Sequence, residues 1–168
     1  MAQIFDTLSA KDEMCMEDFT KAVFAFSKLT EINSRRSARY TAAADRVKNI
    51  HLKIIFMNYA FQAQQLNADL KRWISAYGVQ TAYANEGYFT AMWSKVRDMF
   101  TFGAEDAVFS SCEQLEDEAL KNYKTAMILS FLPEAALKDV EKQFKEIQKI
   151  KDNLRSMKQS HVYELQAA

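Results

Sequence analysis

The sequence predicts an all-α protein, a four-helix bundle, and three observations favour long helices in one domain. The chain has 168 residues, and 49% of them are hydrophobic, which is enough for a sizeable core. Only three Gly and one Pro are present, so few positions force the chain to turn and short strands are disfavoured. Apolar residues recur at helical spacing along four long segments. Because no repeat or linker divides the chain, we expect a single domain over residues 1–168.

The first two helices are expected to span about 9–47 and 51–77. Ser9 resembles an N-terminal cap, and the inward stripe of the first helix turns polar in its middle. The second helix is apolar on its inward side and also on the opposite side of its first half. A helix that is apolar on two faces needs cover on both. The residues of this second apolar face are Ile50, Ile54, Met57 and Phe61.

A long crossover is expected between the second and third helices. Gly78 ends the second helix, and about thirty residues follow that contain a short amphipathic helix. Its apolar residues are Trp93, Val96 and Phe100. Such a connection allows the second and third helices to run parallel. The third helix is expected from about Ala104 to Ser130. Pro133 opens the fourth, in the first turn where proline is tolerated, and the tail after about Gln159 is expected to fray.

Charge and cysteine content restrict the class of partner. Lys and Arg total 22 against 22 Asp and Glu, so no net field draws the chain to nucleic acid or to an anionic membrane, and neither partner is expected. Cys15 and Cys112 form no ligand-like pair, and both are interpreted as buried thiols. With no signal peptide or apolar run of membrane length evident, we expect a cytoplasmic protein.

Four runs of sequence resemble a bacterial ferritin-like four-helix-bundle family known only as a domain of unknown function (2383). They are LTEINSRRSARYTAAADRV, IIFMNYAFQAQQLNADL, MWSKVRDMFTF and SSCEQLEDEALKNYKTAM. The resemblance spans about Phe19 to Lys158. Its most specific residues are Cys112, Glu113, Glu116, Asp117 and Tyr123. It implies a ferritin-like bundle with the long crossover, and it implies no established activity.

The residues argue against the metal centre that such bundles often hold. A di-iron or di-manganese site needs a Glu from each of two helices and a Glu-x-x-His from each of the others. The positions three before His51 and His161 are both lysines, so the motif is absent. At positions of the first helix where members of the family commonly have acidic residues, this sequence has small side chains. Lys151 stands where members often have a histidine late in the fourth helix. The small residues are Ser37, Ala38 and Thr41. We expect no cofactor.

Glu116 is the one carboxylate that helical periodicity turns inward, although a position at the boundary of the core stays open. An unpaired buried carboxylate would cost several kcal/mol or take up a proton, so a cation is expected opposite it, either Lys151 or Arg36. The remaining members of this predicted polar cluster are Tyr40, Tyr59, Tyr123 and Gln62. Glu113 and Asp117 are expected on the solvated face. The run Arg35, Arg36 and Arg39 otherwise reads as surface charge.

The sequence favours a non-catalytic protein that acts in interaction or assembly. No phosphate loop, nucleophile elbow or zinc-type cysteine cluster is present, and no catalytic residue is assigned. A homodimer through the second apolar face is expected, with Phe24 of the first helix as a possible addition. The first alternative is a ferritin-like iron or manganese oxidase or store, with metal around Glu113, Glu116 and Gln62. The second is a small-molecule pocket lined by aromatic side chains, whose ligand stays unknown.

Overall fold

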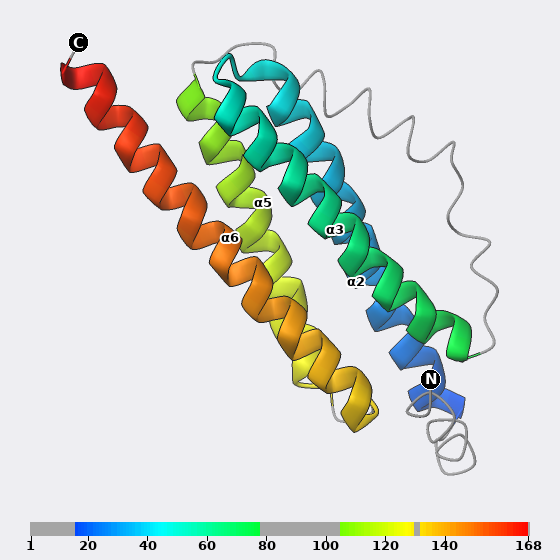
Figure 1. Cartoon of the computed structure of the whole chain (residues 1–168). Coiled ribbons are helices and arrows are strands. Elements are labelled where there is room, and N and C mark those ends of the chain that lie inside the picture. The colour runs from blue at the N-terminus through cyan, green and yellow to red at the C-terminus, as the bar shows by residue number, and fades with distance from the viewer. Residues whose placement is uncertain (1–15, 78–104, 130–131, 168) are drawn as a thin grey trace.

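The computed structural model describes residues 16–77, 105–129 and 132–167 of the chain. These residues form four helices, with no strand among them (Figure 1). In chain order the helices are α2 (Met16–Arg46), α3 (Ile50–Ala76), α5 (Glu105–Met127) and α6 (Glu134–Ala167). The prediction of an all-α fold with four long helices is therefore confirmed for the residues that the structure describes.

Local sequence accounts for several helix ends. The side-chain oxygen of Asn49 caps α3 by accepting hydrogen bonds from the backbone N–H groups of His51 (2.9 Å) and Leu52 (3.4 Å). Pro133 stands directly before α6, and its carbonyl accepts the first bond of that helix, from the N–H of Leu137 at 2.9 Å. The cap predicted at Ser9 lies outside the described residues.

One boundary prediction was wrong. The tail after Gln159 was expected to fray, but α6 continues to Ala167. Its last eight residues contain no Gly or Pro and include good helix formers, so nothing in this segment ends the helix.

The four helices form a bundle in which neighbours are antiparallel (Figure 1). α2 packs against α3 and against α5, and α5 packs against α6, whereas α3 and α6 have little contact. α3 and α5 run in the same direction. The predicted crossover with its short helix falls on residues 78–104, outside the described residues.

The core consists of two apolar clusters with polar side chains between them. One cluster surrounds Phe26 and Leu70, and the other surrounds Tyr40 and Phe56. Along α2 the change from one cluster to the other occurs between Ile32 and Tyr40, where the inward stripe is polar. The buried polar residues are Asn33, Arg36, Ser37, Arg39, Asn67, Glu116 and Gln143. Within the three described segments, no helix is both long and apolar enough to cross a membrane.

Candidate functional site

An ion pair between Arg36 of α2 and Glu116 of α5 occupies the middle of the bundle. Both side chains are 0% exposed. Arg36 donates through Nε to both oxygens of Glu116, at 2.9 Å and 3.1 Å. The hydroxyl of Tyr40 donates to Oε1 of the same carboxylate at 2.5 Å. The charge of Glu116 is therefore neutralised and hydrogen-bonded inside the core, which is the condition under which a buried carboxylate is stable.

Hydrogen bonds continue from this pair through the other helices. Arg36 donates through Nη1 to Oδ1 of Asn33 at 2.9 Å, and the amide of Asn33 donates to the hydroxyl of Tyr123 at 2.7 Å. The Tyr123 hydroxyl donates to Oε1 of Gln143 at 2.6 Å. Gln143 in turn donates to the backbone carbonyl of Leu66 at 3.3 Å. One chain of bonds thus links all four helices.

Burial and the ion pair set the protonation states of this cluster. Burial lowers the pKa of Arg36, but the charge and hydrogen bond of Glu116, together with the neighbouring Tyr40 and Tyr123, outweigh burial and leave the pKa above its usual value. Burial, reinforced by the charge of Glu116, raises the pKa of Tyr40 well above its usual range, and burial also raises the pKa of Tyr123. The guanidinium therefore stays charged and both phenols stay protonated as donors. Nη2 of Arg36 has no hydrogen-bond partner among the described residues.

The other predicted members of the polar cluster lie elsewhere. Of the two expected cations, Arg36 contacts Glu116, whereas the ammonium of Lys151 bonds Asp117 near the surface. Tyr59 is half-buried; its ring packs edge-on against Tyr40, with centroids 5.3 Å apart. Gln62 faces α6. The buried carboxylate is therefore bonded by Arg36 and Tyr40, whereas Lys151, Tyr59 and Gln62 are only partly buried and make their contacts elsewhere.

Two expectations about surface charge were wrong. Arg36 and Arg39 are buried, with exposures of 0% and 8%, because this part of α2 is covered by α5 as well as by α3. Arg39 bonds the hydroxyl of Ser111. Glu113, expected on the solvated face, has a side chain only 18% exposed, and Lys158 lies 3.3 Å from it. Asp117 is more than half exposed, as expected for a solvated position.

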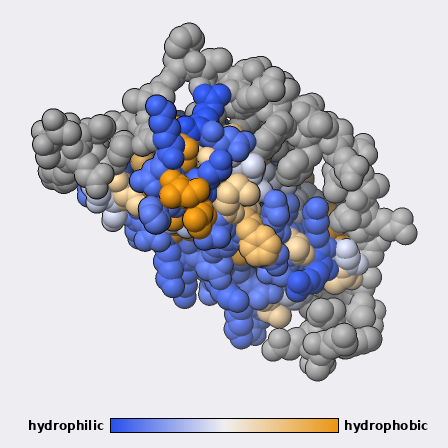
Figure 2. Space-filling model, turned by 45° about the horizontal axis from the view of Figure 1, so that its top comes forward, coloured by the Kyte–Doolittle hydropathy of each residue, from blue (hydrophilic) through white to orange (hydrophobic). Residues whose placement is uncertain are grey.

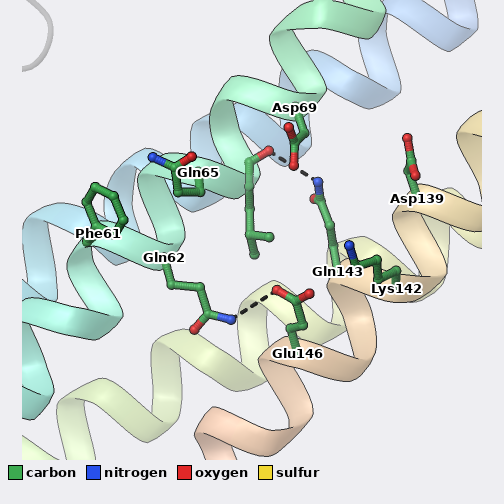
Figure 3. Close-up of a pocket in the computed structure, with 9 residues that line it drawn as sticks. Phe61, Gln62, Gln65, Asp69, Asp139, Lys142, Gln143 and Glu146 are labelled. Carbon is green, nitrogen blue, oxygen red and sulfur yellow. Dashed lines mark hydrogen bonds between the residues drawn. The ribbon is translucent and has the colours of Figure 1, made fainter. Parts of the chain in front are cut away.

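A groove of about 320 Å³ lies between α3 and α6, where the two helices have little contact (Figure 3). Gln62 spans it by donating to Oε2 of Glu146 at 3.0 Å. Near one end, Nε1 of Trp73 donates to Oδ2 of Asp139 at 3.0 Å. The charged residues of the lining are three carboxylates and one ammonium, so the groove is acidic. The residues that line it are Phe61, Gln62, Gln65, Leu66, Asp69, Asp139, Lys142, Gln143 and Glu146.

Sequence analysis missed this groove. Asp139, Gln143 and Glu146 recur on one face of α6, and Gln62, Gln65 and Asp69 recur on one face of α3. That polar spacing was the available signal. The sequence alone does not show which polar face meets which, so the two rows could not be joined.

The residues present do not fit a resident di-metal centre. Both oxygens of Glu116 are engaged by Arg36, and one of them also by Tyr40. Within the described parts of the chain, no three His, Cys, Asp or Glu side chains gather closely enough to hold a metal ion. Burial raises the pKa of the Cys112 thiol to about 12, so this side chain is a neutral apolar group rather than a thiolate ligand.

The second apolar face of α3 is exposed to solvent. We call Ile50, Ile54, Met57 and Phe61 the α3 stripe; their exposures are 61%, 52%, 46% and 61%. Apolar side chains gather in this way on an otherwise largely hydrophilic face of the molecule (Figure 2). Phe24 is also exposed, but it does not extend the stripe. Its neighbour Phe26 packs against Trp73, far along α3 from Ile50.

Comparison with known proteins identifies the family. The chain matches no curated protein. The sequence model of the family described as Domain of unknown function (DUF2383) matches residues 21–128, which include nearly all of α2 and the whole of α3 and α5. This match covers more than half of the 168 residues. The chain therefore belongs to the family of the domain of unknown function DUF2383.

Proposed function

We propose that this protein is a ferritin-like four-helix bundle in which an ion pair stands where a metal centre would lie, and that it acts in interaction or assembly rather than catalysis. The observation that carries the proposal is the completely buried pair of Arg36 and Glu116. Metal sites of ferritin-like bundles are built in the core from inward carboxylates of facing helices. Here the inward carboxylate of α5 is bound by a guanidinium from α2, which supplies the positive charge that a metal would bring.

The α3 stripe supports a role in self-association. Four large apolar side chains, each about half exposed or more, lie at i, i+4, i+7 and i+11 on one face of one helix. Contiguous exposed apolar surface of this kind is typical of protein interaction sites. The proposed assembly is a cytoplasmic homodimer, formed without nucleic acid, membrane or cofactor.

Two measurements on protein purified without chelator test the proposal. We expect iron and manganese far below one atom per chain by elemental analysis, and the mass of two chains by sedimentation at tens of micromolar. Near-stoichiometric metal would replace the proposal with a di-metal carboxylate protein. A clean monomer would remove the assembly role.

A matched pair of variants locates the interface. Ile54→Glu places a charge in the α3 stripe, and we expect it to produce monomers. Ile128→Glu changes an apolar residue that is 80% exposed near the end of α5, outside the stripe, and it should leave the dimer intact. Equal effects of the two substitutions would show that the stripe is not the contact surface.

A further inference from the structure

Charge is distributed unevenly along the face of α3 that carries the stripe. From Arg46 to Gln65 the chain contains no Asp or Glu. The exposed basic residues of this stretch are Arg46, Lys48, His51 and Lys53. Beyond Phe61, at the other end of the stripe, lies the acidic groove. Its Asp69 pairs with Arg72 of the same helix at 3.1 Å, so the remaining carboxylates of the groove belong to α6. The stripe thus joins a basic end to an acidic end.

A surface with this pattern is complementary to itself. In a two-fold dimer the same patch is used by both copies, and if the two α3 helices are antiparallel the basic end of each meets the acidic end of the other. A parallel arrangement would place like charges together, which costs free energy and disfavours that alternative.

We infer that a second copy of this chain docks on the α3 stripe in antiparallel register, and that the basic start of its α3 enters the groove between α3 and α6. This inference rests on the self-association proposed above, and it specifies the register and the polar contacts. Ile54 then faces Met57 of the second copy, and Ile50 faces Phe61.

Helix geometry brings His51 to the groove in this register. His51 and Gln62 are eleven residues apart, about three helical turns, so they lie on the same side of α3. A two-fold axis perpendicular to the helices keeps that side common to both copies. In the antiparallel register His51 of the second copy lies level with Ala60, about 3 Å along the helix from Gln62. Gln62 is the residue that holds Glu146 by a hydrogen bond of 3.0 Å.

The area that a stable dimer interface buries also requires that the groove be part of the interface. A stable interface buries about 800 Å² on each partner. Four half-exposed side chains supply less than this, so the flanking charged ends have to be covered as well. At the groove α3 and α6 have little contact with each other, so this part of α3 is available to a second copy. Gln143, which lines the groove, already has its hydrogen bonds within the chain.

Charge reversal tests the register directly. Glu at position 51 lies in the first turn of α3, where a negative charge suits the helix dipole, so His51→Glu should not harm folding of the helix. We expect His51→Glu to raise the dissociation constant of the dimer about tenfold or more at low salt, because the new carboxylate faces Glu146 of the second copy and the two negative charges repel each other. His51→Lys should lower the dissociation constant, and that gain should disappear as salt screens the contact.

The decisive experiment is rescue. His51→Glu combined with Glu146→Lys should restore the dimer, with circular dichroism used to check that each variant is folded. The matched control combines His51→Glu with Glu141→Lys, an exposed acid of α6 outside the groove, and should not restore it. If both combinations restore the dimer, or if neither His51 variant changes the affinity while Ile54→Glu still gives monomers, the register is wrong and the self-association stands. A wild-type monomer overturns both proposals and leaves the stripe to a different protein.

Discussion

Replacing Arg36 by Met tests whether the buried ion pair has the energetic role that its geometry implies. The substitution keeps an unbranched apolar side chain in place but removes the cation beside Glu116, whose side chain has no exposed surface. Leaving one charge of a buried pair without its partner costs about 3–5 kcal/mol. The upper part of that range is expected here, because Oδ1 of Asn33 also loses its donor.

Urea unfolding followed by circular dichroism at 222 nm, at one fixed protein concentration, measures the loss. A fixed concentration matters because stability of an associating protein depends on it. The matched control is Lys28→Met, which breaks a pair with Glu31 on the same helix whose side chains are 52% and 41% exposed. Such an exposed pair contributes about 0–1 kcal/mol. If Arg36→Met costs no more than Lys28→Met, the ion pair does not lie in a water-free core and the reasoning fails.

Three further outcomes follow from the same core. In a Cys15→Ser background, the thiol of Cys112, with its pKa raised to about 12, should react with a disulfide reagent at pH 8 only after urea is added; rapid reaction of the folded protein would contradict its burial. Burial raises the pKa of Cys112 from 9.0 to about 12 and that of Tyr77 from 10.0 to about 12, so the unfolded chain releases these protons first. The contribution of these two raised pKa values to the free energy of unfolding is complete below about pH 9 and is lost toward pH 12. The urea midpoint should therefore fall between these pH values, and it should fall less steeply for Cys112→Ala. Tyr123→Phe leaves the carbonyl oxygen of Gln143 without its donor and should cost about 1–3 kcal/mol in the same urea assay, whereas Tyr59→Phe at a half-buried position should cost less.

Helical periodicity and composition were sufficient to predict much of the fold. The near absence of Gly and Pro predicted four long helices, and the apolar stripes gave most of the residues that the core contains. The tail was assigned wrongly because the ends of chains are commonly poorly ordered, whereas every residue of this tail tolerates a helix.

The partner of Glu116 shows where sequence reasoning stopped. Arg36 and Lys151 have similar angular positions on their own helices, so periodicity could not choose between them. The choice depends on how far along the bundle each residue lies, and that level is set by tertiary packing. In the structure Lys151 meets Asp117, next to Glu116 in sequence but on the outer side of α5.

The buried polar side chains between the two apolar clusters also explain how four long helices can select one register. Sliding α2 along α5 by one turn would move Arg36 about 5.4 Å from Glu116 and leave both charges buried without partners. Purely apolar stripes carry no comparable penalty, because one aliphatic contact replaces another. We therefore expect Arg36→Met combined with Glu116→Leu to be less destabilised than either single variant, yet to lose conformational uniqueness. Amide NMR spectra of this double variant should show broadened or doubled signals from α2 and α5. Sharp, single signals would mean that the surrounding side chains, among them Phe26 and Phe109, fix the register without the ion pair.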